Sequence, residues 1–184
     1  AKAWADYFGY EADFGGGTSL YDAVDFSIKK RLNKVQGRKA IVLFTDGVDT
    51  TSTRSGYDSS IDLAEESDAL IFPIYYNTYG RTNNRSGWPG LGGVIYDTRG
   101  TRPEDYALGR KYLEDLASYT GGRVFRSEST PGGLSNAFAG IAEELRRQYN
   151  IGYTPDSEGK PGQRKQIRVR VDRPGLIIRA RDSY

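Results

Sequence analysis

The stretch that decides the fold is Lys39-Ala40-Ile41-Val42-Leu43-Phe44-Thr45-Asp46-Gly47-Val48-Asp49-Thr50. Its apolar run, residues 40–44, is too short for an ordinary helix and contains Ile and Val. We therefore expect a strand buried on both faces at the centre of a parallel sheet. Open α/β sheets place their ligands just past the carboxyl ends of such strands, where Asp46 lies. The alternative is that Asp46 and Gly47 only make a turn.

Composition and length indicate a single globular domain. With 184 residues, 37% hydrophobic and 27% charged, the chain is long enough to bury one core. No run of about 18 apolar residues is present, so we expect no membrane span. The net charge of +2 is too small to argue for a nucleic-acid partner. The first residue is Ala1, which indicates a processed or partial product.

Charge is concentrated near the carboxyl terminus. Residues 160–184 hold eight Lys and Arg against two Asp, or +6, so the rest of the chain carries −4. Such a segment can bind an acidic partner, although these charges are more often the solvated face of strands.

The chain has neither His nor Cys. This excludes the usual Ser-His-Asp and Cys-His forms of catalysis, disulfides, and metal sites built from imidazole or thiolate. A metal would have to be held by oxygen, which points to Mg²⁺, Mn²⁺ or Ca²⁺.

Periodicity along the chain predicts alternating helices and strands. Helices are expected over residues 1–8, 19–35, 60–68, 106–119 and 134–149, and further strands over 70–76 and 123–126. Pro73 lies inside its strand, which favours a bulge or a position near an edge. The last helix is expected to turn Leu134, Phe138, Ile141, Ala142 and Leu145 inward. We expect residues 77–105 to form a long Gly- and Arg-rich loop with Trp88, which is either a disordered or simple surface excursion or, as the alternative, a binding loop.

The period changes to two near the end of the chain. Ile167, Val169 and Val171 alternate with polar residues, and 173–175 is a turn signal. We expect an antiparallel β extension over residues 149–184, packed on an α/β domain over residues 1–148. The predicted fold class is a Rossmann-like three-layer α/β sandwich with a mostly parallel central sheet and this extension.

The order of motifs resembles the von Willebrand factor type A (VWA) domain. The matching segments are 15–23 (Gly-Gly-Gly-Thr-Ser-Leu-Tyr-Asp-Ala), 38–50, 113–125, and the ending formed by 148–153 with 164–181. That ending is similar to a bacterial, Acidobacterial-type branch of the family. The resemblance covers about residues 15 to 184, and its strength lies in four motifs in the right order.

The resemblance implies a metal-ion-dependent adhesion site built from three loops. Thr18 matches the second loop and Asp46 the third, so both are expected as metal ligands, with Asp49 and Trp88 at the rim. The first loop, Asp-x-Ser-x-Ser, is not in this chain. One Asp and one Thr are too few for an ion that needs six or more ligands. We therefore expect weak metal binding unless residues precede the chain or belong between Phe8 and Gly15.

Three functions follow as hypotheses. The first is a non-catalytic adhesion or protein-binding module, whose Mg²⁺, Mn²⁺ or Ca²⁺ ion takes its last ligand from an acidic residue of a partner. The second is a metal-free scaffold of the same fold for protein assembly. The third is a Mg²⁺-dependent phosphatase-like hydrolase that uses Asp46 as nucleophile. It is the least favoured, because Asp46 and Asp49 are three residues apart, one more than in the Asp-x-Asp-x-Thr loop of such enzymes. The family alone implies an extracellular or periplasmic location.

Overall fold

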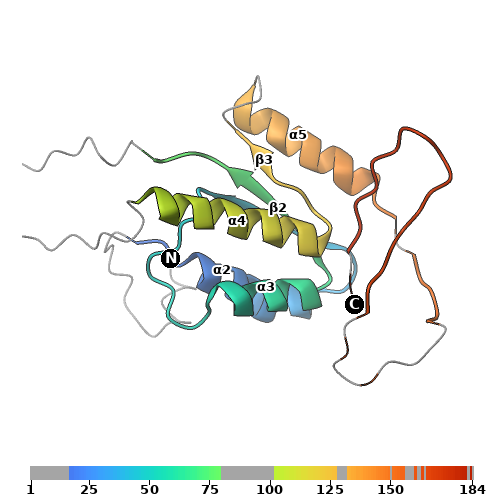
Figure 1. Ribbon diagram of the computed structural model, residues 1–184, viewed down its shortest axis with the longest axis horizontal. Coiled ribbons are helices and arrows are strands. Elements are labelled where there is room, and N and C mark those ends of the chain that lie inside the picture. The colour runs from blue at the N-terminus through green and yellow to red at the C-terminus, as the bar shows by residue number, and fades with distance from the viewer. Residues whose placement is uncertain are drawn as a thin grey trace, which may run out of the picture.

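The computed structural model describes residues 17–79, 102–127, 132–149, 151–155, 160, 163, 165–181 and 183 (Figure 1). Its helices are α2 (Leu20–Phe26, continued by a π turn, Ser27–Arg31, and a 3₁₀ turn, Leu32–Lys34), α3 (Tyr57–Glu66), α4 (Pro103–Thr120) and α5 (Gly133–Arg146). Its strands are β1 (Lys39–Thr45), β2 (Ala69–Tyr75) and β3 (Phe125–Arg126). The predicted elements in these ranges are confirmed, with boundaries that shift by at most three residues.

The three strands form one parallel sheet in the order β1-β2-β3. Lys39 is opposite Ala69 and the pairing continues to Thr45 opposite Tyr75, while β3 pairs only with Ile74 and Tyr75. Helices α2, α3 and α4 cover one face and α5 lies on the other (Figure 1). The chain is therefore an α/β protein with a small parallel sheet, an arrangement compatible with a Rossmann-like sandwich.

The prediction that β1 is central and buried on both faces is wrong for the described part of the chain. There β1 pairs with β2 alone, and β2 is the central, almost fully buried strand. The side chains of Val42 and Phe44 are 41% and 52% exposed. The reason is that Ile41 and Leu43 face helices α2 to α4, whereas α5 packs over β2 and β3 and leaves the other face of β1 partly open.

The prediction from Pro73 is also wrong, because β2 lies in the middle of the sheet. The amide of Ile71 donates to Thr120 Oγ1 at 3.1 Å, and the Tyr75 carbonyl accepts from the Ser127 amide at 3.1 Å. Odd-numbered residues of β2 thus direct their backbone groups away from β1. Pro73 has no amide hydrogen to donate, but its nitrogen faces away from β1, so no hydrogen bond to β1 is lost. On its other side β2 pairs with β3 only at Ile74 and Tyr75, beyond the position of the proline.

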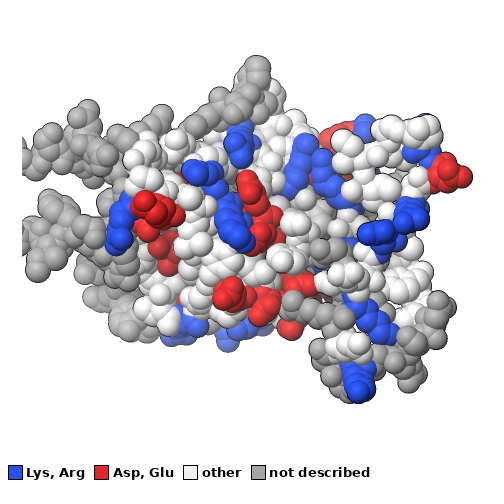
Figure 2. All heavy atoms as spheres, viewed as in Figure 1, with Lys and Arg blue, Asp and Glu red and all other residues white. Residues whose placement is uncertain are grey.

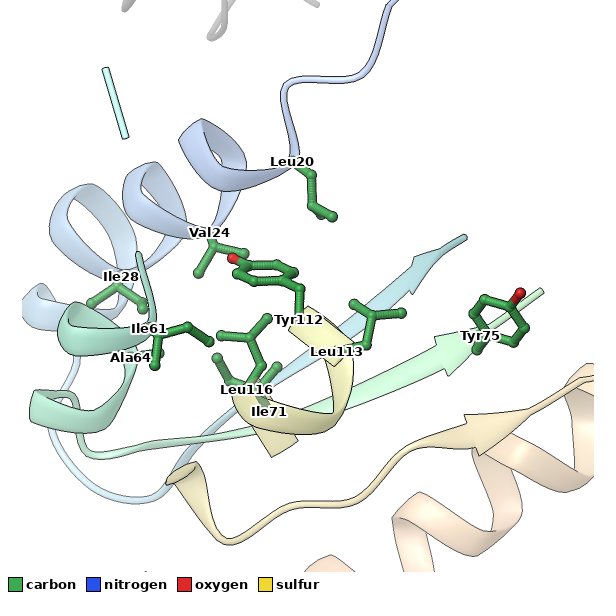
Figure 3. Packing of buried hydrophobic residues seen from close by; sticks show 10 residues of the cluster. All are labelled: Leu20, Val24, Ile28, Ile61, Ala64, Ile71, Tyr75, Tyr112, Leu113 and Leu116. Atoms are coloured by element: carbon green, nitrogen blue, oxygen red, sulfur yellow. The ribbon is translucent and has the colours of Figure 1, made fainter. Parts of the chain in front are cut away.

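The main core lies between the sheet and helices α2, α3 and α4 (Figure 3). Its buried members are Leu20, Val24, Ile28, Ile61, Ala64, Ile71, Tyr75, Tyr112, Leu113 and Leu116. A smaller core on the opposite face joins Phe72 and Ile74 of β2 to Ala137 and Ile141 of α5. Of the residues predicted to face inward on this last helix, Ile141 is buried and Leu145 packs against this core, whereas Leu134, Phe138 and Ala142 are exposed. The reason is that α5 contacts the sheet through the row formed by Ala137, Ile141 and Leu145.

Glycines set the end of α4. Gly121 has φ +79° and closes the helix in the left-handed conformation. A Cβ on Gly122 would lie 2.0 Å from the Ile71 carbonyl oxygen, so only glycine allows this turn to pass beside β2.

Side chains near the carboxyl terminus attach the C-terminal segment to α3 and α5. Arg181 donates to the carbonyls of Glu65 and Ser67 at the end of α3, and Arg179 contacts Glu144 of α5 at 3.2 Å. The predicted β extension is not shown: in the described residues one antiparallel bridge, Gln166 with Ser183, is found there. Figure 2 shows Lys and Arg gathered over this segment, with mixed charges over the helices.

Some predictions fall outside the described residues, namely the helix at 1–8, the glycines at 15 and 16, and most of the long loop with Trp88. Among the described residues, no helix combines the length and apolar character that crossing a membrane requires.

Candidate binding site at the carboxyl end of the sheet

Three segments meet where β1 and β2 end, and we call them the carboxyl-end loops: residues 17–19, 46–56 and 76–79. The Thr18 amide donates to Thr50 Oγ1 at 2.7 Å. The Thr18 carbonyl accepts from the amides of Thr50 at 2.8 Å and Thr51 at 3.2 Å. The loop that carries Thr18 and the loop that begins with Asp46 are therefore joined through their backbones, while Thr18 itself is exposed.

Asp22 organises the loop after β1. This residue lies in the first turn of α2 and is only 3% exposed. Its carboxylate accepts the backbone amides of Thr53 at 3.0 Å, Arg54 at 3.1 Å and Ser55 at 2.8 Å. Charge-assisted bonds of this kind are the stronger class of hydrogen bond, so Asp22 fixes residues 53–55 against α2. The sequence prediction missed it, although an acidic residue in a helix's first turn beside a polar loop was the available signal.

Asp49, predicted at the rim, accepts hydrogen bonds from the same loop and from the start of α2. Its Oδ2 accepts the Tyr21 amide at 3.0 Å and the Ser52 hydroxyl at 2.5 Å. Its Oδ1 accepts the Ser52 amide at 3.0 Å. Both oxygens thus bond groups of the protein, and the half-buried carboxylate ties α2 to residues 49–52.

Asp46 makes the turn contact that its position predicts and also bonds a neighbouring loop. Its Oδ1 accepts the Val48 amide at 3.1 Å, which is a turn contact. Its Oδ2 accepts the hydroxyl of Thr78, which lies in the loop after β2 and also contacts the Tyr106 hydroxyl at 3.1 Å. Burial and the charge of Asp46 raise the pKa of Tyr76. Asp46 therefore links two carboxyl-end loops, and Thr78 is a neighbour that the sequence prediction missed.

A close approach of backbones holds the Asp46 turn in place. Gly47 has φ +85°, and a Cβ there would lie 2.4 Å from the carbonyl oxygen of Gly109 in α4. The amide of Gly47 donates to Thr45 Oγ1 at 3.0 Å. Glycine at both contact positions lets α4 pass directly against the turn, which fixes where Asp46 points.

A tyrosine cluster supports these loops from below. The rings of Tyr21 and Tyr57 meet Tyr112 edge-on, with centroids 4.7 and 5.2 Å away. Burial, and then the negative charge of Asp49, raise the pKa of Tyr21 to about 12. Burial also raises the pKa of Tyr112, whose hydroxyl contacts Ser60 at 2.9 Å. The phenols stay neutral at ordinary pH, so their role here is packing.

The chemistry of the site is that of hard oxygen ligands, but the described residues alone do not complete a metal site. Within the described ranges, no three His, Cys, Asp or Glu side chains come together. Asp46 and Thr18 supply oxygen donors, yet Mg²⁺ requires about six, and both oxygens of Asp46 already accept hydrogen bonds. Trp88 lies outside the described residues.

No family model, curated protein or solved structure matches this chain. The likeness to the VWA family therefore rests on the sequence motifs alone.

Proposed function

We propose that this chain is a non-catalytic, protein-binding module of the VWA type that contacts its partner through the carboxyl-end loops. The observation that carries the proposal is the way the carboxylates of Asp22 and Asp49 order these loops. Asp22 and Asp49 bond the backbone of residues 52–55 and the start of α2, so the loops present a fixed surface. A preorganised surface loses little entropy when a partner binds.

The preferred mode of binding uses an acidic residue of the partner. Thr18 and Asp46 lie on loops that the structure joins, and both provide oxygen donors of the kind that Mg²⁺, Mn²⁺ or Ca²⁺ takes. In this mode the partner's carboxylate and residues outside the described ranges would complete the ligand set. The likeness to the VWA family supports this mode, and it also supports a three-layer domain over residues 1–148 with a C-terminal β extension and an exported location.

The second candidate is a metal-free scaffold for protein assembly. It is favoured by a specific observation: the carboxylates of Asp46 and Asp49 are satisfied by protein donors without an ion. In this mode the same loops bind the partner by shape and hydrogen bonds.

The test is calorimetric titration of the protein with Mn²⁺. A second calorimetric titration then uses short peptides that carry a central Asp or Glu, with and without Mn²⁺. If the preferred mode is right, Mn²⁺ binds, peptide binding requires it, and Asp46→Ala abolishes both. Asp58→Ala removes an exposed carboxylate on α3 and should change neither. Peptide binding that ignores Mn²⁺ but is lost in Asp46→Ala would favour the scaffold. Binding that survives Asp46→Ala unchanged would refute the proposed surface.

A further inference from the structure

The turn near the end of the chain projects from the body of the protein, and we call residues 171–178 the C-terminal tip. Gln166 and Ser183 form an antiparallel bridge at the base of this segment. Counting inward along both arms from the bridge places the turn at Pro174 and Gly175, whose φ is +79°. Figure 1 shows this loop in dark red, beyond the ends of the helices.

The base of the segment is held at the amino end of the sheet. Arg181 donates to two carbonyls at the end of α3, just before β2 begins. Arg179 contacts Glu144 of α5 at 3.2 Å. These contacts place the C-terminal tip at the opposite end of the sheet from the carboxyl-end loops (Figure 1).

The C-terminal tip is apolar on both of its sides. Leu176, Ile177 and Ile178 are 51%, 82% and 41% exposed, and Val171 on the other arm is 50% exposed. Consecutive side chains of an extended chain point to opposite sides, so Ile177 points away from the side that Leu176 and Ile178 share. A protein that packs on one side would leave the other side in water, whereas a lipid interface surrounds a projecting turn. The arrangement therefore favours lipid.

The charge around the C-terminal tip is positive. Residues 165–181 hold six Lys and Arg against a single acidic residue, Asp172, or +5. Two of these arginines hold the base, whereas Arg168, Arg170 and Arg173 are exposed beside or within the tip. Guanidinium groups form paired hydrogen bonds with phosphate oxygens, and anionic lipid surfaces attract basic side chains. The charge is thus complementary to an anionic bilayer.

We propose that the C-terminal tip inserts its apolar side chains into the headgroup region of an anionic lipid bilayer, with the neighbouring arginines on lipid phosphates. Apolar side chains of proteins that lie on membranes reach a depth of about 5 to 10 Å. From Arg179, which is held by α5, to Gly175 an extended chain spans about 13 Å. The tip can therefore reach this depth while its base stays on the body. The inference does not depend on the function proposed for the carboxyl-end loops, which would face away from the bilayer.

The test is flotation of the full chain with vesicles of equal parts phosphatidylcholine and phosphatidylglycerol, and with vesicles of phosphatidylcholine alone. We expect binding to the anionic vesicles that weakens as salt is added, because salt screens the arginines. Leu176→Asp should lower the partition coefficient by at least about tenfold, since one large apolar side chain is no longer buried. Arg170→Gln should lower it about fivefold. Leu108→Asp on α4 is the matched control and should bind as the parent does, because Leu108 is also 51% exposed.

The chain has no cysteine, so a single fluorescent probe can be placed on the tip. An environment-sensitive fluorophore on Ile177→Cys should shift its emission to the blue with the anionic vesicles. The same fluorophore on Leu108→Cys should show no shift. Circular dichroism of each variant separates loss of binding from loss of folding.

Several results would overturn the proposal. One is a parent protein that binds no vesicles, or that binds both kinds equally. Another is vesicle binding that survives Leu176→Asp unchanged, because the contact with lipid would then lie elsewhere. A dimer that Leu176→Asp dissociates, without vesicle binding, would identify the tip as a contact between copies. Binding to polyglutamate but not to vesicles would identify an acidic protein as the partner.

Discussion

Replacing Asp22 with alanine should loosen the loop that follows β1. The carboxylate accepts three backbone amides, those of Thr53, Arg54 and Ser55, at 2.8 to 3.1 Å. Alanine leaves all three without this acceptor and removes a charge-assisted contact between the loop and α2. The fold of the core should persist, because no hydrophobic contact is lost.

The magnitude follows from the number and exposure of these bonds. A hydrogen bond to a charged group contributes about 1.5 to 3 kcal/mol. The amides of Thr53 and Arg54 belong to exposed residues that water can reach once the loop moves, so we take about 1 kcal/mol for each bond. Asp22→Ala should then lower the free energy of unfolding by about 3 kcal/mol, or the Tm by about 10 °C for a chain of this size. Asp22→Asn keeps one carbonyl oxygen and should cost about half as much.

The assay is urea and thermal unfolding followed by circular dichroism, with hydrogen exchange at residues 53–55. Those amides should exchange much faster in Asp22→Ala, while the amides of β2 change only with global stability. Glu66→Ala is the matched control, because it removes an exposed carboxylate from the end of α3. If Asp22→Ala unfolds within about 0.5 kcal/mol of the parent, the spread expected for neutral surface changes, the carboxylate does not order the loop and our reasoning is wrong.

Three further predictions concern the rest of the described structure. Gly47→Ala should cost at least about 2 kcal/mol in thermal unfolding, because it adds strain at φ +85° and a Cβ 2.4 Å from the Gly109 carbonyl oxygen; normal stability would contradict that close contact. The pKa of Tyr21 is raised from 10.0 to about 12, so between these pH values the folded state keeps a proton that the unfolded state releases, and the free energy of unfolding should fall as pH rises through this range. The pKa is measured by absorbance titration of the parent protein and of Tyr21→Phe. A difference between the two titration curves that is centred near pH 10 would refute the raised pKa. Arg181→Ala should cost about 1 kcal/mol and speed exchange at the end of α3, where the guanidinium bonds two carbonyls; exposed Arg170→Ala is the control, and equal effects of both would contradict the anchoring role.

Much of the local structure was predictable because each element is marked by its own residues. The four-residue spacing of Leu20, Val24 and Ile28 fixes the buried side of α2, and glycines mark the end of α4. The position of β1 was not predictable in the same way. An apolar run shows that a strand can be buried, but which neighbour covers each face depends on helix placement far away in the chain, and α5 leaves Val42 and Phe44 open.

The candidate site was predictable in part. Asp46 and Thr18 were expected at one edge of the sheet, and the structure joins their loops through Thr50. The bonds that organise those loops could not be read from sequence, since Asp22 is 31 to 33 residues from the amides it accepts. Spacing along the chain reveals local turns, whereas such long-range bonds depend on the complete fold.

Pro73 has a consequence for how the sheet assembles. Every second residue of β2 donates to β1, and proline occupies a position that faces the other way. If β2 slipped by one residue during folding, the residue without a donor would turn toward β1 and the mispaired sheet would lack a hydrogen bond at its centre. Pro73 therefore costs no hydrogen bond in the native register but destabilises a register shifted by one residue, which favours correct pairing of β2 with β1.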